Sequence, residues 1–285
     1  MLGHLHQPDR NAPRSAASDK LSSPYRLTPN VRAEAAERRR MARDLGVAMR
    51  DGTLLLQFQP RLALNTGRAL GAQALIRWPH RKRGLVPPAV FLRSAEQSGQ
   101  MEALGIWALT AACRAANRWP APLGVSLAVP LGRIATGTLP AQVAAALEAS
   151  GLAPERLEIS LGEAVLHDID GDGFLILSAI RDLGVGVALD DFGGALASLA
   201  MLRRLPLTAM KLDRSLMRGL PASREDAAFV RAAIDVSRAL GLASLADGVD
   251  TEPQRAFLAG AGCEQGQGHL FGAPAADCPP ARPAG

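Results

Sequence analysis

From residue 54 to residue 267, short apolar runs alternate with helical patterns, and this alternation constrains the fold more than any other feature of the sequence. Short runs rich in apolar and β-branched residues predict strands, and the longer amphipathic segments between them predict helices. Alternating strands and helices are typical of a parallel α/β architecture, and eight strands favour a closed (β/α)8 barrel of the TIM type. The strands are predicted at residues 54–59, 69–77, 124–129, 157–161, 185–190, 208–212, 243–246 and 264–267, and the helices at residues 103–119, 138–150, 173–183, 196–204, 225–240 and 252–261.

Charge is distributed unevenly along the chain. Residues 1–50 hold ten Lys/Arg against five Asp/Glu, and the totals of 32 and 27 leave 22 of each for residues 51–285. The net charge of +5 therefore belongs to the first 50 residues, and the remainder is neutral. A basic stripe on a folded domain marks nucleic-acid binding, so a DNA or RNA polymer is not an expected partner.

The segments that precede and follow the alternating region differ in composition from it. The leader, residues 1–30, is rich in Pro, Ser, Asn and Asp and has no apolar periodicity, which predicts disorder. Residues 31–50 predict a basic, mostly polar helix with Met41, Leu45 and Met49 on one apolar edge. Such a helix can pack on a barrel, bind an acidic partner or lie on an anionic membrane, and a solvated lead-in helix is its commonest meaning, so membrane contact is not expected. The disordered leader, the lead-in helix, the barrel and a flexible tail are predicted at residues 1–30, 31–50, 51–275 and 276–285.

The sequence contains no targeting signal that we can identify. No apolar run approaches the ~18 to 20 residues of a membrane span, because charged, Pro or Gly positions interrupt each one. The N-terminus lacks the basic start and apolar run of a secretory signal, so a cytoplasmic location is expected. Cys113, Cys263 and Cys278 lack C-x-x-C spacing and are expected to be reduced thiols.

Two adjacent carboxylates stand where the strand at 185–190 ends. In VGVALDDFGG, an apolar run leads directly into Asp190 and Asp191 and then into glycines. Catalytic groups of a (β/α)8 barrel project from the C-terminal ends of its strands. One carboxylate can bridge two divalent ions while its neighbour binds one, as a metal-dependent phosphodiesterase requires. The same pair can equally cap the following helix, so the local pattern leaves both interpretations open.

Single polar residues stand at the ends of the strands that follow. They are Lys211 in MKLDRS, Asp247 in LADGVD and Gln267 in QGQGHLFG. Because they occur one per βα unit, their side chains should converge on one barrel mouth. This spacing favours a functional site over a helix cap.

From about Arg43 to Pro274 the chain resembles the EAL domains that hydrolyse cyclic-di-GMP. The similarity rests on blocks that occur in order, namely FQP, QALIRW, GLVPP, DDFGG, KLDRS, DGVD and QGQGHLFG. The resemblance implies a modified (β/α)8 barrel, commonly dimeric, with cyclic-di-GMP lying across its mouth. It also implies metal-dependent hydrolysis of one phosphodiester, which gives linear pGpG.

The chain departs from the family at three metal-binding positions. Gln73 replaces the glutamate of Glu-Ala-Leu, Ala128 replaces the asparagine of Asn-Leu-Ser, and Ser160 replaces the first glutamate of Glu-x-Thr-Glu. A glutamine is a neutral, weaker ligand, and an alanine cannot coordinate an ion. We therefore expect one of the family's two metal sites to be lost.

The resemblance assigns the surviving metal ligands to Asp190, Asp191 and Asp247, of which Asp247 replaces a glutamate. These carboxylates could hold a single Mg²⁺ or Mn²⁺ weakly, and no ion is required if the protein is inactive. Lys211 and Gln267 match the lysine and glutamine beside the attacking water and would be vestigial catalytic residues. Losing one metal-binding or oxyanion-stabilising partner commonly costs ~10² to 10³ in rate, so three losses predict little turnover.

Nucleotide recognition depends on other residues. By resemblance, Gln59, Arg77 and Arg214 contact the ligand or support its pocket, and Glu163 and Asp213 support the site. A guanidinium binds phosphate through bidentate, charge-assisted hydrogen bonds. Alternatively, Arg77 is a residual ion-pair partner in a dead site, and the sequence favours neither interpretation.

Three functions remain open on the sequence. The favoured one is a catalytically inactive signalling protein that contacts an unidentified protein partner, as degenerate EAL domains do. A second is a cyclic-di-GMP receptor, in which nucleotide shifts a partner-binding equilibrium. A third is a residual phosphodiesterase that converts cyclic-di-GMP to pGpG with one metal ion. A homodimer is compatible with the apolar helices beside residues 193–205, but core packing explains them equally well.

Overall fold

The computed structural model describes most of the chain from the lead-in helix onward. The chain divides into two compact units, Met1–Arg40 and Met41–Gly285, and the helix α1 (Pro29–Arg50) contributes to both. Most of the predicted disordered leader and nearly all of the predicted tail lie outside the described residues, so those two predictions remain predictions. The described residues are 29–130, 134, 136–163, 169, 171–193 and 199–276.

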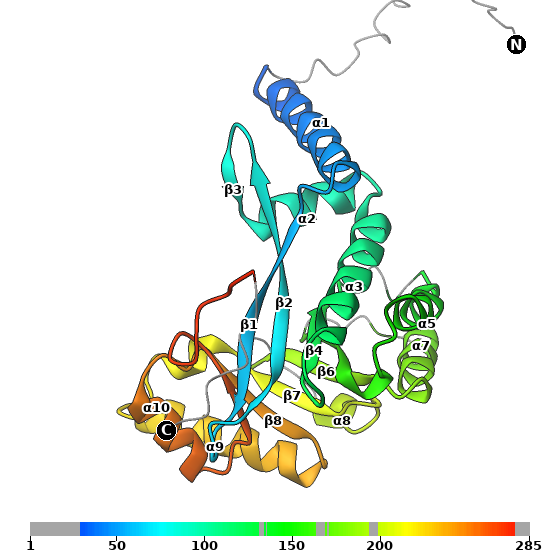
Figure 1. Cartoon of the computed structure of the whole chain (residues 1–285). Coiled ribbons are helices and arrows are strands. Elements are labelled where there is room, and N and C mark those ends of the chain that lie inside the picture. The colour runs from blue at the N-terminus through cyan, green and yellow to red at the C-terminus, as the bar shows by residue number, and fades with distance from the viewer. Residues whose placement is uncertain are drawn as a thin grey trace, which may run out of the picture. The chain divides into compact units, whose positions relative to one another are not determined.

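Eight strands close a barrel, which confirms the predicted (β/α)8-type fold. Around the barrel their order is β1-β9-β8-β7-β6-β5-β4-β2, and β1 pairs with β2 to close it. Figure 1 shows β1 and β2 as long strands that reach beyond the other six. The strands are β1 (Leu55–Ala63), β2 (Ala69–His80), β4 (Gly124–Ala128), β5 (Leu157–Gly162), β6 (Gly186–Phe192), β7 (Ala209–Leu212), β8 (Ala243–Asp247) and β9 (Gln265–Gln267).

The strand β1 runs against the direction of its neighbours. It pairs antiparallel with both β2 and β9, whereas the remaining barrel neighbours pair in parallel. Only residues 64–68 separate β1 from β2, and a parallel crossover needs a dozen or more residues. The short connection therefore makes a hairpin. Near its end β2 also pairs with β3 (Gly84–Val86), a strand that we did not predict.

The helices follow the barrel strands in sequence. The predicted helix at 196–204 is shorter among the described residues, where α8 spans Leu199–Leu202. The helix α2 (Pro88–Gln97) was not predicted, although proline at its first position is a recognised helix start. The remaining helices are α3 (Met101–Asn117), α5 (Leu139–Ser150), α7 (Gly171–Asp182), α9 (Arg224–Ala239) and α10 (Glu252–Gly260), with 3₁₀ turns η1 (Pro154–Arg156) and η2 (Arg214–Met217).

Two hydrophobic clusters hold the second unit together. The larger one fills the barrel and the space between its strands and helices. The smaller one packs Met41 and Leu45 of α1 against Trp78, Phe91 and other residues of β2, α2 and α3. The second half of the lead-in helix is thus part of the barrel unit, with the apolar edge turned inward. Of the helices in the described part of the chain, none is both long and apolar enough to span a membrane.

Candidate functional site

The ends of the parallel strands bring polar side chains together, as the sequence spacing predicted. Asp190, Lys211 and Asp247 each follow a buried stretch of their strand, so the strand fixes their position at the barrel mouth. All but Asp247, which is partly exposed, are less than 9% exposed. The residues are Gln73 of β2, Ser160 of β5, Asp190 of β6, Lys211 of β7, Asp247 of β8 and Gln267 of β9.

The ammonium group of Lys211 is the centre of this cluster. Its Nζ atom lies 3.1 Å from Oδ1 of Asp190, 3.2 Å from Oδ2 of Asp247 and 3.3 Å from Oε1 of Gln73. An ammonium has three N–H donors, so the three acceptors match its capacity. Burial lowers the pKa of Lys211, but the attraction of Asp190 and Asp247 raises it by more, and its pKa lies above the ordinary value. Lys211 therefore stays charged although it is buried.

A chain of three glutamine amides extends from Lys211 across β2, β9 and β1. Oε1 of Gln73 accepts hydrogen bonds from Lys211 and from Nε2 of Gln267, the latter at 2.6 Å. Nε2 of Gln267 also donates to Oε1 of Gln59 at 2.9 Å. Oε1 of the Gln73 side chain therefore already accepts two hydrogen bonds from other side chains of the protein.

The two carboxylates of the Asp-Asp pair have different surroundings. Oδ1 of Asp190 accepts the backbone N–H of Asp191, and its Oδ2 accepts the Ser160 hydroxyl at 3.3 Å. Asp191 is exposed and has a φ of 59°, a left-handed conformation that is uncommon for a residue other than glycine. Partial burial and the charge of Asp190 raise the pKa of Asp191. The pair thus combines one enclosed and one exposed acid.

Other acids that we singled out have structural partners. Oδ1 of Asp247 accepts the N–H of Gly248 at 2.8 Å. Asp213 caps η2 by accepting the N–H of Ser215, and its supporting role at the site stays a prediction. Glu163 is buried directly after β5 and does not line the mouth.

Arg77 and Arg214 both line the barrel mouth. Nε of Arg77 donates to Oε1 of Gln57 at 2.8 Å, and Nη1 donates to the backbone oxygen of Ile76. Burial lowers the pKa of Arg77. A Cβ added to Gly248 would lie 2.7 Å from Cβ of Arg214, so glycine at 248 allows this close approach.

A cavity of about 420 Å³ opens at the mouth. It is bordered by the predicted site residues Gln59, Gln73, Arg77, Ala128, Asp190, Asp191, Lys211, Arg214, Asp247 and Gln267. Ser160 lies instead beside a much smaller space of about 10 Å³ that Gln73, Asp190, Lys211 and Gln267 also line. All of the predicted ligand and metal positions except Ser160 therefore border one concave surface.

We did not predict a role for His269, which also borders the mouth cavity. Oδ1 of Asp250 lies 3.0 Å from both the backbone N and Nδ1 of His269. The sequence signal was present, since His269 lies within the block QGQGHLFG that carries Gln267. A strand-end criterion misses it because it follows the strand by two residues.

The donor set at the mouth does not suit a pair of divalent ions. Within the part of the chain that the structure describes, no group of three or more His, Cys, Asp or Glu side chains is arranged to hold a metal. Hard divalent cations prefer carboxylate and other oxygen ligands. At the three altered positions the chain offers one amide, one methyl and one hydroxyl, and Asp190 and Asp247 share the single ammonium of Lys211.

The chain is similar in sequence to known proteins of one family. The sequence profile of the EAL domain matches residues 42–274. NbdA, a cyclic di-GMP phosphodiesterase of Pseudomonas aeruginosa, is 38% identical over 245 residues, which cover 84% of this chain and 31% of NbdA. MucR of the same organism, a bifunctional diguanylate cyclase/cyclic di-GMP phosphodiesterase, is 34% identical over 250 residues, covering 86% of this chain and 36% of MucR.

A solved structure shares the fold. The PaMucR phosphodiesterase in complex with c-di-GMP matches with a TM-score of 0.79 at 34% identity, over 83% of this chain and 97% of that one. The chain spans about a third of the length of the two curated relatives. Since the family profile covers most of the residues and the barrel matches in both sequence and structure, the chain belongs to the EAL domain family.

Proposed function

We propose that this chain is a catalytically inactive EAL domain that takes part in cyclic-di-GMP signalling by binding a protein partner. The observation that carries the proposal is the replacement of three expected metal ligands by Gln73, Ala128 and Ser160, which offer an amide, a methyl and a hydroxyl. Lys211 pairs with the remaining acids Asp190 and Asp247 and also bonds to Gln73.

The three altered positions supply too little negative charge for two divalent ions. Asp190 and Asp247, which remain, share the ammonium of Lys211. The side-chain amide of Gln73 is neutral, so it supplies no negative charge to balance a metal ion. The hydroxyl of Ser160 donates a hydrogen bond to Asp190 and adds no negative charge to the site. Each of these features opposes a two-ion clamp on a phosphodiester.

Cyclic-di-GMP is nevertheless a ligand that the mouth could bind. The relative NbdA is a cyclic di-GMP phosphodiesterase, MucR is a bifunctional diguanylate cyclase/cyclic di-GMP phosphodiesterase, and the PaMucR structure contains c-di-GMP. In this chain Arg77 and Arg214 line a cavity of about 420 Å³, within the usual range of about 300 to 1,000 Å³ for small-molecule sites. Two guanidinium groups suit a ligand that carries two phosphates. These observations favour the receptor as the second candidate function.

The proposal is tested by incubating the purified chain with cyclic-di-GMP and either Mg²⁺ or Mn²⁺ and measuring pGpG. We expect no pGpG above a no-protein control. Turnover that disappears in Asp190→Ala would overturn the proposal in favour of a residual phosphodiesterase. Calorimetric titration with cyclic-di-GMP decides the receptor function separately, because heat of binding without pGpG requires nucleotide recognition but no hydrolysis.

A further inference from the structure

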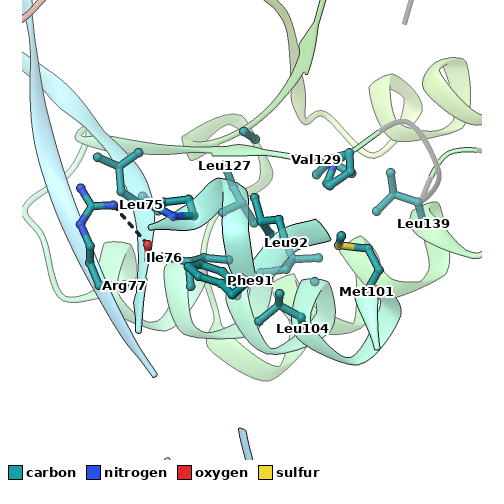
Figure 2. Close-up of a pocket in the computed structure, with 17 residues that line it drawn as sticks. Leu75, Ile76, Arg77, Phe91, Leu92, Met101, Leu104, Leu127, Val129 and Leu139 are labelled. Carbon is teal, nitrogen blue, oxygen red and sulfur yellow. Dashed lines mark hydrogen bonds between the residues drawn. The ribbon is translucent and has the colours of Figure 1, made fainter. Parts of the chain in front are cut away.

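A second cavity, of about 330 Å³, lies beside the barrel mouth. Figure 2 shows its walls, which come from β2, α2, α3, the end of β4 and, at Leu139, the start of α5. Leu75, Arg77 and Ala128 border both this cavity and the mouth cavity, so the two spaces adjoin. Of the 17 residues that line it, Arg77 is the only one with a polar side chain.

The cavity has a buried floor and an exposed rim. Phe91, Leu104 and Leu127 of the floor are each at most 4% exposed. Pro88, Ala128 and Pro130 of the rim are exposed. A ligand can therefore enter from the surface and place its apolar part against the floor.

An open apolar recess of this size suits a small ligand. Small-molecule sites are mostly apolar clefts of about 300 to 1,000 Å³. A dry cavity of about 150 Å³ lined by Leu, Ile and Phe takes up benzene. The cavity here is about twice as large, so it has room for roughly ten carbon atoms. Water would find one polar side chain in it and fewer than its usual two to four hydrogen-bond partners.

The electrostatics of Arg77 indicate the charge of the ligand. Both of its hydrogen-bond acceptors, Oε1 of Gln57 and the backbone oxygen of Ile76, are neutral. No carboxylate among the described residues forms an ion pair with it, and partial burial lowers its pKa. The dashed line in Figure 2 shows the bond to Ile76, with the guanidinium at the end of the cavity nearest Leu75. An anion at this end would provide the missing counter-charge.

We propose that this cavity binds an amphiphile with one unbranched hydrocarbon chain of about ten carbons and an anionic head that pairs with Arg77. The chain lies along Phe91, Leu92, Met101 and Leu104, and the head faces the barrel mouth. This site adjoins the nucleotide site and shares Arg77 with it, but its remaining lining is apolar.

The test is a calorimetric titration of the full chain with sodium decanoate below its micelle-forming concentration. We expect binding of one decanoate, about ten-fold or more weaker binding of octanoate, and no measurable binding of butyrate, because each buried methylene contributes to affinity. Decanol should bind more weakly than decanoate because it has no charge to pair with Arg77. Decyl phosphate in a parallel titration distinguishes a phosphate head from a carboxylate head.

Two variants separate the tail and head contributions. Ala128→Phe should abolish decanoate binding, because it adds bulk at an exposed rim position where it does not threaten folding. Arg77→Gln should weaken decanoate binding about ten-fold or more while leaving decanol binding unchanged. The matched control is Arg93→Gln, which removes an exposed arginine of α2 that does not line the cavity, and it should bind decanoate like the wild type. A thermal unfolding scan of each variant confirms that it is folded.

Three results would overturn the proposal. They are no decanoate binding by the wild type at about a millimolar, equal affinities for decanoate and octanoate, or unchanged binding by Ala128→Phe. The shared wall also predicts that decanoate competes with cyclic-di-GMP; this last point rests on the proposed function, whereas the titrations with decanoate alone do not.

Discussion

The Nζ atom of Lys211 lies 3.1 Å from Oδ1 of Asp190, so a buried ammonium faces the enclosed acid of the Asp-Asp pair. The same ammonium lies 3.2 Å from Oδ2 of Asp247, which belongs to the strand on the other side of β7. One cation thus joins carboxylates from two different strands. Its removal would leave two acids close together with no charge between them.

Lys211→Met should therefore destabilise the protein. Removing one partner of a buried ion pair leaves an uncompensated charge and commonly costs about 3 to 5 kcal/mol. Methionine keeps the length of the side chain, so the loss reports on charge more than on packing. The free energy of unfolding at pH 7, measured by urea denaturation, checks this expectation. Lys82→Met, at an exposed position, is the control and should change the free energy by less than about 0.5 kcal/mol.

The contribution of Lys211 should also depend on pH in a defined direction. Its pKa is raised in the folded protein, so the folded state holds this proton more tightly than the unfolded state does. The stabilisation is complete below the ordinary lysine pKa of about 10.4 and is lost as pH rises through the folded pKa. Above neutral pH, where the carboxylates are ionised, the stability difference between the wild type and Lys211→Met should shrink only in this alkaline range. A difference that is already lost at pH 8 would contradict the assigned ion pairs.

Asp191→Asn should make the protein more stable at neutral pH. The pKa of Asp191 is raised, so its charged form is disfavoured in the folded state and stability falls as pH rises from the unfolded to the folded pKa. Asparagine removes the charge and tolerates the left-handed backbone at φ 59°. We expect a higher melting temperature at pH 7 and no gain at pH 3, where the aspartate is already protonated. Equal shifts at both pH values would point to a conformational cause instead.

Much of the barrel and its mouth could be predicted from the sequence. Apolar runs that end in a single polar residue locate both a strand and its C-terminal end, and a closed barrel must bring such ends together. Asp190, Lys211, Asp247 and Gln267 meet for this reason. The reversed direction of β1 could also have been foreseen, because residues 64–68 are too few for a parallel crossover.

Other features depend on packing that no local pattern encodes. The strand β3 is only three residues long and follows a charged turn, so it has little periodicity to detect. The partners of Lys211 lie on β2, β6 and β8, and which side chains come within reach depends on how these strands pack in the barrel. The second cavity arises where α2 and α3 cover the end of β4, and its residues are far apart in the sequence.

Gly248→Ala should disturb the turn that carries Arg214. Glycine 248 has a φ of 79°, and a Cβ there would lie 2.7 Å from Cβ and 3.2 Å from Cα of Arg214. Gly99→Ala is a matched control, because Gly99 has a φ of 70° with nothing within 4 Å of an added Cβ. The control should cost about 1 to 2 kcal/mol from backbone strain alone. Gly248→Ala should lower the free energy of unfolding, measured by urea denaturation, by more than the control does. Equal losses would mean that Arg214 and η2 can move aside at no extra cost.

Restoring the family's ligands should create a phosphodiesterase if the altered positions are the cause of inactivity. The variant combines Gln73→Glu, Ala128→Asn and Ser160→Glu. Glutamate at 73 would lie beside the ammonium of Lys211, and glutamate at 160 would lie beside Asp190, so both acids would join the existing cluster. With Mn²⁺ we expect pGpG formation at least ~10² faster than in the wild type, the usual effect of regaining a metal-binding partner.

The control for the restored variant adds Asp190→Ala, which should abolish the new activity because Asp190 is one of the expected metal ligands. Single restorations should give no measurable pGpG, because a clamp on the attacking and leaving oxygens needs both ions. A triple variant that is folded, binds Mn²⁺ and cyclic-di-GMP, and still forms no pGpG would mean that a different feature prevents turnover. The first candidate would then be the shorter reach of Asp247, and Asp247→Glu in the triple background would test it.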